Sequence, residues 1–201
     1  MAKHIKLKEL LDFLKENRDK RFLITFHSMG DRDAVGSAIG LHECLPRSVI
    51  AAPDFITNSS KRMLKELGSK IELGFSFPQN IDGVIVVDAN NFDALGPFKD
   101  RVADYGNKVL FVDHHLPQKN DEPQDAIMFD NEGYNSASSI VCDVLQKLRF
   151  KMSSDAATAL INGIIADSSE FHNMYPKTFK QIADLLKTSG LRYDDLLARF
   201  D

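Results

Sequence analysis

Cysteine is scarce in this 201-residue chain, and the two that occur, Cys44 and Cys142, lie far apart in segments with apolar periodicity. No Cys-x-x-Cys pair is found, which argues against the common redox motif and against thiolate-rich structural zinc sites. We therefore expect two reduced core cysteines in a cytoplasmic protein.

Long hydrophobic runs are also missing. No stretch approaches the roughly 18 uninterrupted apolar residues of a membrane span, and residues 1–16 contain lysines but no apolar signal core. The sequence therefore predicts neither a membrane partner nor a secretion signal.

Positive charge is not in excess either, because 25 Lys and Arg residues stand against 29 Asp and Glu residues, a net charge of -4. Duplex DNA requires a broad basic face, so this balance argues against it as a partner. A nucleotide, a short single-stranded oligonucleotide or a bridging metal ion remains compatible with the charge.

The hydrophobic fraction of 43% suits one compact domain with a sizeable core. Almost continuously apolar segments alternate with helical patterns, as expected for parallel strands that helices cover on both faces. The expected strands are 21–27, 48–52, 82–89 and 107–115. The expected helices are 7–17, 33–45, 59–68, 136–148, 153–168, 178–190 and 193–200. We predict a single α/β domain, with a mainly parallel β-sheet flanked by helices and a helical C-terminal part.

Three of these strands end in residues that can bind metal: His27 with Asp31 and Asp33, then Asp88, then Asp113 with His114 and His115. In an open α/β sheet, ligands bind outside the carboxyl ends of the strands, so these side chains should meet in one cleft. Asp167, which ends an apolar helical stretch, is a fourth candidate.

Clustering four or five carboxylates is unfavourable, because like charges repel and desolvated ions lose their hydration. Divalent cations remove this cost, and an oxygen-rich set with one or two imidazoles suits Mn²⁺ or Mg²⁺ better than zinc. Two such ions about 3.5 to 4 Å apart can activate a water for in-line phosphoryl displacement. Taken singly, Asp33 or Asp88 could cap a helix and His27 could be a core histidine. Their shared placement at strand ends favours a metal centre.

Four segments resemble, in order, the motifs of the DHH phosphoesterases: FHSMGDRDAVGSA (26–38), VIVVDAN (84–90), VLFVDHH (109–115) and GIIADSSEF (163–171). This superfamily includes RecJ-like nucleases, oligoribonucleases that are also pAp phosphatases (nanoRNases), exopolyphosphatases, cyclic dinucleotide phosphodiesterases and family II pyrophosphatases. The resemblance implies a manganese-dependent phosphoesterase whose DHH domain spans residues 1–201.

The resemblance also implies a role for each motif residue. One Mn²⁺ would be held by His27, Asp31 and Asp88, and a second by Asp33, Asp88, His114 and Asp167, so that Asp88 is shared. His115 would contact the substrate phosphate. Asp113 would accept a hydrogen bond from a neighbouring imidazole and so orient it, without binding a metal ion itself.

Three further residues are candidates for substrate contact. Gly36 and Ser37 match the family and could present free N–H groups to a phosphate, although close packing of the helix on the sheet explains the glycine equally well. Arg32 could touch the substrate or be a solvated loop residue. For Ser136, Ser138 and Ser139, helix capping is favoured over substrate contact.

Some positions depart from the family pattern. Met29-Gly30 stands where Asn-Pro is common, Arg32 replaces a glycine, and Asp167 is followed by two serines instead of Thr-Gly. The ligand positions are intact, so we expect metal binding to survive.

Most relatives carry a second, C-terminal substrate-binding domain (DHHA1-type), often with a Gly-Gly-Gly-His signature, and no glycine cluster follows Asp167. We expect that domain to be absent, through truncation rather than natural shortness, and hydrolysis to be weak and poorly selective.

Short oligonucleotides and pAp are the leading substrates. Pyrophosphate, polyphosphate and cyclic dinucleotides are alternatives, and a catalytically weak nucleotide-binding regulatory module is an alternative of another class. Homodimerisation stays open.

Overall fold

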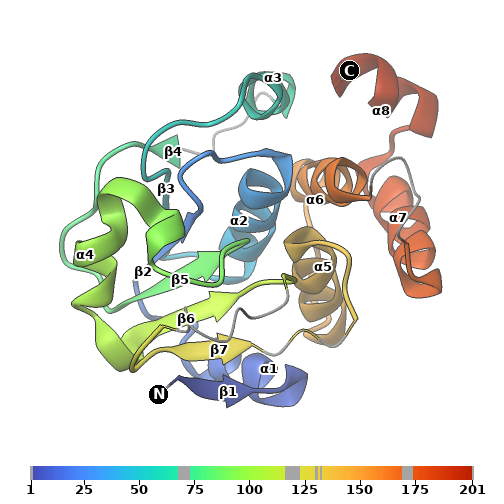
Figure 1. Cartoon of the computed structure of the whole chain (residues 1–201). Coiled ribbons are helices and arrows are strands. Elements are labelled where there is room, and N and C mark those ends of the chain that lie inside the picture. Colours follow the sequence, from blue (N-terminus) through green and yellow to red (C-terminus); the bar gives the residue numbers. More distant parts are fainter. Residues whose placement is uncertain are drawn as a thin grey trace.

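The computed structural model describes residues 2–67, 73–115, 123–129, 131, 133–168 and 174–200. Within them, seven parallel strands form one sheet in the order β1-β7-β6-β5-β2-β3-β4 (Figure 1). The strands are β1 (Lys3–Ile5), β2 (Phe22–Phe26), β3 (Val49–Ala51), β4 (Leu73–Gly74), β5 (Gly83–Val87), β6 (Val109–Val112) and β7 (Ile127–Phe129). The predicted α/β fold with a parallel sheet is confirmed.

The helices surround this sheet. They are α1 (Leu7–Glu16), α2 (Arg32–Cys44), α3 (Asn58–Leu67), α4 (Lys99–Ala103), α5 (Ala137–Lys147), α6 (Ser154–Asp167), α7 (Pro176–Ser189) and α8 (Tyr193–Phe200), with short 3-10 turns η1 (Asp93–Phe98) and η2 (Gly106–Lys108). Among the described helices, none is both long and apolar enough to cross a membrane.

Alternate side chains of the central strands build two cores on the two faces of the sheet. In β2, Phe22, Ile24 and Phe26 pack with α1, α2 and α5, whereas Leu23 packs on the opposite face with η1 and α4. Figure 1 shows α4 and α2 on opposite sides of the strands. All five residues of β2 are buried, because a parallel strand in the middle of a sheet is covered on both faces.

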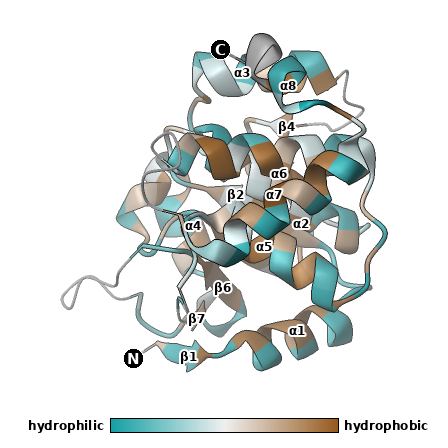
Figure 2. Ribbon diagram, turned by 90° about the vertical axis from the view of Figure 1, so that its right-hand side faces the viewer, coloured by the Kyte–Doolittle hydropathy of each residue, from teal (hydrophilic) through white to brown (hydrophobic). Residues whose placement is uncertain are grey.

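Helix α6 packs against α2 and α5, and α7 packs against α6. The surface helix α1 is amphipathic, with brown and teal positions interleaved along its length (Figure 2). Its Leu10 and Leu14 are buried, as the heptad-like leucine spacing predicts.

Helix starts follow the expected capping chemistry. The Ser136 hydroxyl accepts a hydrogen bond from the Ser139 N–H at the start of α5, which confirms its predicted capping role. The Asp31 carboxylate caps α2 by accepting hydrogen bonds from the N–H groups of Asp33 and Ala34. Asp31 therefore has a structural role whatever else it does.

Three strands, β1, β4 and β7, were not expected from the sequence. Each has only two or three residues, and β1 contains the exposed Lys3 and His4, so no apolar run marks them. They extend the sheet at its edges, away from the central strands.

The order of the strands reverses between β2 and β5. From β2 the chain continues to β3 and β4 on one side, and then returns to add β5, β6 and β7 on the other. In an open α/β sheet, such a reversal leaves a crevice at the carboxyl ends of the two strands. The predicted cluster should lie there.

Candidate metal centre

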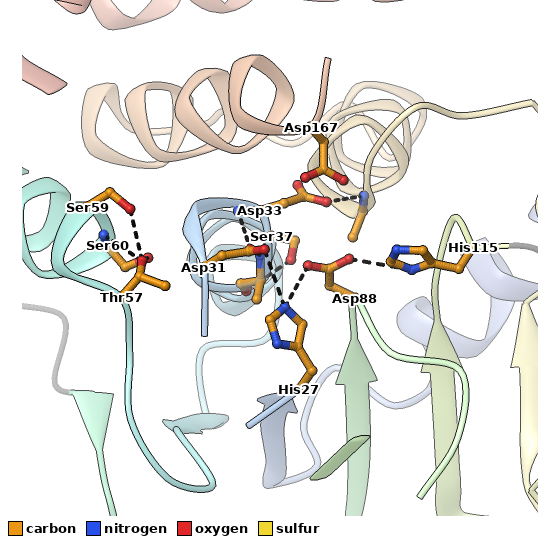
Figure 3. A network of polar contacts seen from close by, with 12 residues as sticks. His27, Asp31, Asp33, Ser37, Thr57, Ser59, Ser60, Asp88, His115 and Asp167 are labelled. Atoms are coloured by element: carbon orange, nitrogen blue, oxygen red, sulfur yellow. Dashed lines mark hydrogen bonds and ion pairs between the residues drawn. The ribbon is translucent and has the colours of Figure 1, made fainter. Parts of the chain in front are cut away.

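The strand register brings the strand-end residues side by side. Phe26 pairs with Val87, and Val87 pairs with Val112, so the next residues along, His27, Asp88 and Asp113, leave the sheet together. Figure 3 shows Asp88 between His27 and His115, with carboxylates of Asp33 and Asp167 approaching from helices α2 and α6. The predicted convergence at one edge is therefore present.

The first group consists of His27, Asp31 and Asp88, whose candidate ligand atoms lie within 4.8 Å of one another. The His27 Nε2 atom is 3.3 Å from Asp88 Oδ2 and 3.6 Å from Asp31 Oδ2. Because the Oδ1 atom of Asp31 caps α2, its Oδ2 atom is left to face the histidine.

The second group consists of Asp33, Asp88, His114 and Asp167, also within 4.8 Å. The His114 Nε2 atom lies 2.9 Å from Asp167 Oδ2, 3.5 Å from Asp88 Oδ1 and 4.0 Å from Asp33 Oδ2. One oxygen of Asp88 therefore faces each group, and Asp88 is the residue that both groups share.

Asp33 is held by the N-terminus of α5. Its two carboxylate oxygens accept hydrogen bonds from the N–H groups of Ala137 (2.6 Å) and Ser138 (2.8 Å). These are free amides of the first helical turn, where the helix dipole favours a negative charge. Burial, together with the neighbouring carboxylates of Asp88 and Asp167, raises the pKa of Asp33 well above its usual range.

The backbone at Asp88 has a positive φ of 56°, a conformation that Asp and Asn tolerate better than most residues. Burial opposes ionisation of Asp88, but the adjacent imidazoles of His114 and His27 outweigh burial and hold its pKa well below the usual range. Asp88 is therefore a buried carboxylate that stays ionised.

The two half-buried histidines of these groups take up protons readily. Burial alone would lower the pKa of His27, but the carboxylates of Asp31 and Asp88 raise it to about 10. In the same way, burial opposes protonation of His114, while Asp167 and Asp88 raise its pKa to about 11. Protons thus partly neutralise an excess of buried negative charge, which bound cations would also do.

Three buried polar atoms of the cluster have no hydrogen-bond partner among the residues that the structure describes: Asp88 Oδ1, Asp113 Oδ2 and His114 Nε2. The 2.9 Å approach of Asp167 to His114 is an ion pair without an aligned hydrogen bond. Buried polar groups are normally satisfied, so such atoms indicate a missing partner. The oxygen-rich set with two imidazoles fits Mn²⁺, and Mg²⁺ is the alternative.

His115 differs from His114 in exposure and partners. Its side chain is 54% exposed, and its Nδ1 atom lies 2.8 Å from Oδ1 of the buried Asp113. The contact raises the pKa of His115 and fixes the orientation of its ring. The imidazole beside the Asp113 carboxylate is that of His115, and the orienting role of Asp113 stays a prediction.

A cavity of about 440 Å³ opens beside the cluster. Its lining combines predicted site residues with small neutral residues that follow β5: His27, Asp31, Asp88, His115 and Asp167, together with Ala89, Asn90 and Ala94. The latter three were not identified from the sequence, because Ala and Asn have no chemistry that marks them as site residues.

Asn131 is a second residue that the sequence did not reveal. Its side-chain amide donates a hydrogen bond to the backbone carbonyl of His114, and its carbonyl oxygen accepts from the N–H groups of Gly133 and Tyr134. It ties the segment after β6 to the segment before α5. The only signal in the sequence was an Asn near a Gly, which is typical of any turn.

The structure does not place Gly36 and Ser37 for phosphate contact. Both lie within α2 and are buried, and a Cβ atom at Gly36 would come within 2.5 Å of the carbonyl oxygen of Ala159 in α6. Close packing therefore explains the glycine at position 36, but α2 packs there against helix α6 and not against the sheet. Ser37 donates its hydroxyl to the Ala34 carbonyl.

Arg32 is half-buried at the start of α2. Like Gly36 and Ser37, it is not among the described residues that line the cavity. Its contact with substrate stays a prediction.

The model of the DHH family N-terminal domain matches residues 21–164, which is well over half of the chain. The chain belongs to the DHH family. The matched residues include the two central strands β2 and β5 and all candidate metal ligands except Asp167.

Individual curated proteins are similar to most of this chain. The chain is 27% identical to the uncharacterized protein MJ0988 of Methanocaldococcus jannaschii, over 89% of this chain and 54% of that protein. It is 30% identical to a probable bifunctional oligoribonuclease and PAP phosphatase NrnA of Streptococcus mutans, over 82% of this chain and 52% of the relative. The chain thus spans about half the length of these relatives.

A solved structure has the same fold. The exopolyphosphatase-related protein of Bacteroides fragilis superposes with a TM-score of 0.78 at 20% identity, over 96% of this chain and 59% of that chain. At this level of identity, the match supports the DHH fold and nothing finer.

Cation binding to this DHH centre should compete with protons. His27 and His114, with pKa values of about 10 and about 11, carry protons near neutral pH and must lose them to bind a metal. Affinity for Mn²⁺ should therefore rise as the pH is raised, with release of roughly one proton per ion. Calorimetric titrations in two buffers of different ionisation enthalpy measure this number. An affinity that does not change with pH would contradict the assignment of both imidazoles.

Restoring the family's proline at position 30 should damage this centre. Gly30 has a φ of +43°, which proline cannot adopt, and its N–H donates to the His27 carbonyl. A Cβ atom there would also lie 2.7 Å from Ile56 Cγ2. We expect Gly30→Pro to lower the free energy of unfolding by about 3 kcal/mol and to weaken Mn²⁺ binding at the His27 group.

Chemical denaturation and Mn²⁺ titration measure both effects of Gly30→Pro. Met29→Asn restores the other family residue at a side chain that is 57% exposed, and serves as the control. It should leave both properties unchanged. A stable Gly30→Pro variant with full Mn²⁺ affinity would show that the loop conformation is not required.

Proposed function

We propose that this chain is a phosphoesterase that uses two divalent cations, Mn²⁺ by preference, to hydrolyse short oligonucleotides or pAp. The observation that carries this proposal is that the two carboxylate oxygens of Asp88 face different groups. Oδ2 lies beside the His27 group, and Oδ1 lies beside the His114 group. Bound at these two groups, the cations would activate the attacking water and stabilise the charge that develops on the phosphoryl oxygens.

The chain's own residues have separate tasks in this proposal. His27, Asp31 and Asp88 would hold one cation, and Asp33, Asp88, His114 and Asp167 the other. Asp33 is fixed by the amides of α5, and Asp31 by its cap on α2, so two of the ligands are held in place before any ion arrives.

His115 would bind the substrate phosphate. Its ring lines the cavity, and Asp113 accepts the hydrogen bond of Nδ1–H, so the Nε2 side is available for a second partner. The raised pKa of His115 favours the protonated ring, which is a better donor to a phosphate oxygen than the neutral one.

The choice of substrate is supported by the relative from Streptococcus mutans, which is described as a probable oligoribonuclease and PAP phosphatase and is 30% identical over 82% of this chain. The 440 Å³ cavity is within the usual range for small-molecule sites. The cavity lining also includes Asn90 and two alanines, which suit a neutral sugar as well as a phosphate.

The test is hydrolysis of a panel with the full chain: a 5'-phosphorylated dinucleotide, pAp, pyrophosphate, a polyphosphate and a cyclic dinucleotide. Each substrate is assayed with Mn²⁺, with Mg²⁺ and with chelator. We expect Mn²⁺-dependent turnover of the dinucleotide or pAp. Turnover of pyrophosphate or polyphosphate alone would move the proposal to a phosphoanhydride hydrolase. Tight nucleotide binding without any product would indicate a regulatory module instead.

A further inference from the structure

Gly163 of α6 lies where three helices meet the second ligand group. It is one helical turn before Asp167, so the two residues share the face of α6 that is turned to the centre. Asp33 of α2 and Ser138 of α5 approach that face, and Asp33 and Asp167 lie close together in Figure 3.

The contact at Gly163 leaves no room for a side chain. A Cβ atom on this residue would lie 2.8 Å from Asp33 Oδ1 and 2.9 Å from Ser138 Cβ, and it would overlap the Ser138 hydroxyl. The hydroxyl could rotate away, but Ser138 Cβ is attached directly to the backbone of α5. Relief of the remaining contacts therefore requires movement of α5 or of the Asp33 carboxylate.

Either movement changes the ligand. The Ser138 N–H donates to Asp33 Oδ1, and the Ala137 N–H donates to Asp33 Oδ2, so a shift of α5 carries the carboxylate with it. Asp33 is completely buried among the described residues, so its carboxylate has no exposed side toward which it can move freely. The position of the Asp33 carboxylate thus depends on the close approach of α5 and α6, which the absence of a side chain at residue 163 permits.

We propose that Gly163 is a positioning residue for the second cation: it allows α5 to press Asp33 into the ligand group formed with Asp88, His114 and Asp167. This inference rests on the proposed two-cation function. According to this inference, a residue without a side chain controls the position of one metal ligand. It predicts that the two cation sites can be weakened separately.

Gly40 offers a matched control on the same helix interface. A Cβ atom at Gly40 of α2 would lie 2.7 Å from Leu160 Cδ2 and 3.0 Å from Val141 Cγ1, so Gly40→Ala also overcrowds the junction of α2, α5 and α6. Its contacts are apolar side chains and include none of the candidate ligands. Both variants should destabilise the fold, but only one should affect a ligand.

The experiment counts Mn²⁺ ions and measures their affinities in the full chain, by calorimetry and by the electron paramagnetic resonance signal of free Mn²⁺. Wild type should bind two ions. Gly163→Ala should bind one ion with unchanged affinity and the other at least about tenfold more weakly, and Gly40→Ala should bind both as wild type does. Ser138→Gly keeps the N–H that holds Asp33 and removes the crowded Oγ and Cβ atoms of Ser138, but it leaves the 2.8 Å contact with Asp33 Oδ1. The double variant Gly163→Ala with Ser138→Gly should therefore recover part of the lost affinity.

Three outcomes would overturn the inference. Unchanged binding of both ions by Gly163→Ala would show that the contact does not position Asp33. Equal loss in Gly40→Ala would show a general loosening of the helices. Wild-type protein that binds fewer than two ions would overturn the proposed two-cation function and this inference with it.

Discussion

Replacement of Asp88 by asparagine is expected to reduce hydrolysis by about a thousandfold or more. The reason is that the two oxygens of Asp88 serve different groups, at 3.3 Å from His27 and 3.5 Å from His114. An amide keeps the size but has one oxygen and no charge. Its backbone should be unaffected, because Asn also tolerates a φ of 56°.

The measurement for Asp88→Asn combines turnover with thermal unfolding at several Mn²⁺ concentrations. In wild type, each ion at a hundredfold excess over its dissociation constant should add about 2.7 kcal/mol of stability, and the variant should lose most of this gain. Asp93→Asn, at an exposed carboxylate on η1 close by in the sequence, is the control and should behave as wild type. An active Asp88→Asn protein would rule out a shared ligand at this position.

The same substitution should have different effects at the two adjacent histidines. His115→Asn is expected to lower kcat/KM by about a hundredfold while two Mn²⁺ ions still bind, because the proposed function makes the half-exposed His115 a substrate contact and not a metal ligand. His114→Asn should weaken the second Mn²⁺ ion directly, because its Nε2 atom faces Asp33, Asp88 and Asp167. Steady-state kinetics and Mn²⁺ titration of both variants separate the two roles.

An alternative for His115 is covered by the same pair of variants. Its ring, with Asp88, Asp113 and His114, also forms a group whose candidate ligand atoms lie within 4.8 Å. If His115→Asn loses Mn²⁺ as His114→Asn does, then His115 is a metal ligand and not a substrate contact. The hydrogen bond from His115 to Asp113 would then orient a ligand, as it does in many metal sites.

Much of the fold could be read from local sequence pattern. The expected strands 21–27, 82–89 and 107–115 contain β2, β5 and β6, and the helical patterns match α2, α5 and α6 within a few residues. These elements are central, and a buried parallel strand needs a run of apolar residues whatever its neighbours are. The edge strands β1, β4 and β7 carried no such signal, because two or three residues that are partly exposed have no pattern of their own.

The same reason explains which site residues could be grouped from the sequence and which could not. His27, Asp88 and His114 could be grouped in advance, because parallel strands all end at the same edge and the residues just beyond them must meet. Gly36 and Ser37 were assigned to phosphate contact from motif position alone, whereas their burial depends on how α6 crosses α2. Asn131 bonds the His114 carbonyl and Ala94 lines the cavity only because of where the fold places them, and their residue types gave no signal in the sequence.

The sequence by itself determined which groups are available: an α/β sheet, two histidines and four carboxylates at or near the ends of its strands and helices, and the order of the DHH motifs. Only the tertiary structure decided how they are shared, with one Asp88 oxygen for each group, and how Asp33 is held by amides 104 and 105 residues away. The physical reason is that strand ends follow from local pattern, whereas these contacts depend on the crossing of α2, α5 and α6. That crossing is set by close packing of residues far apart in the chain, with Gly163 at its tightest point.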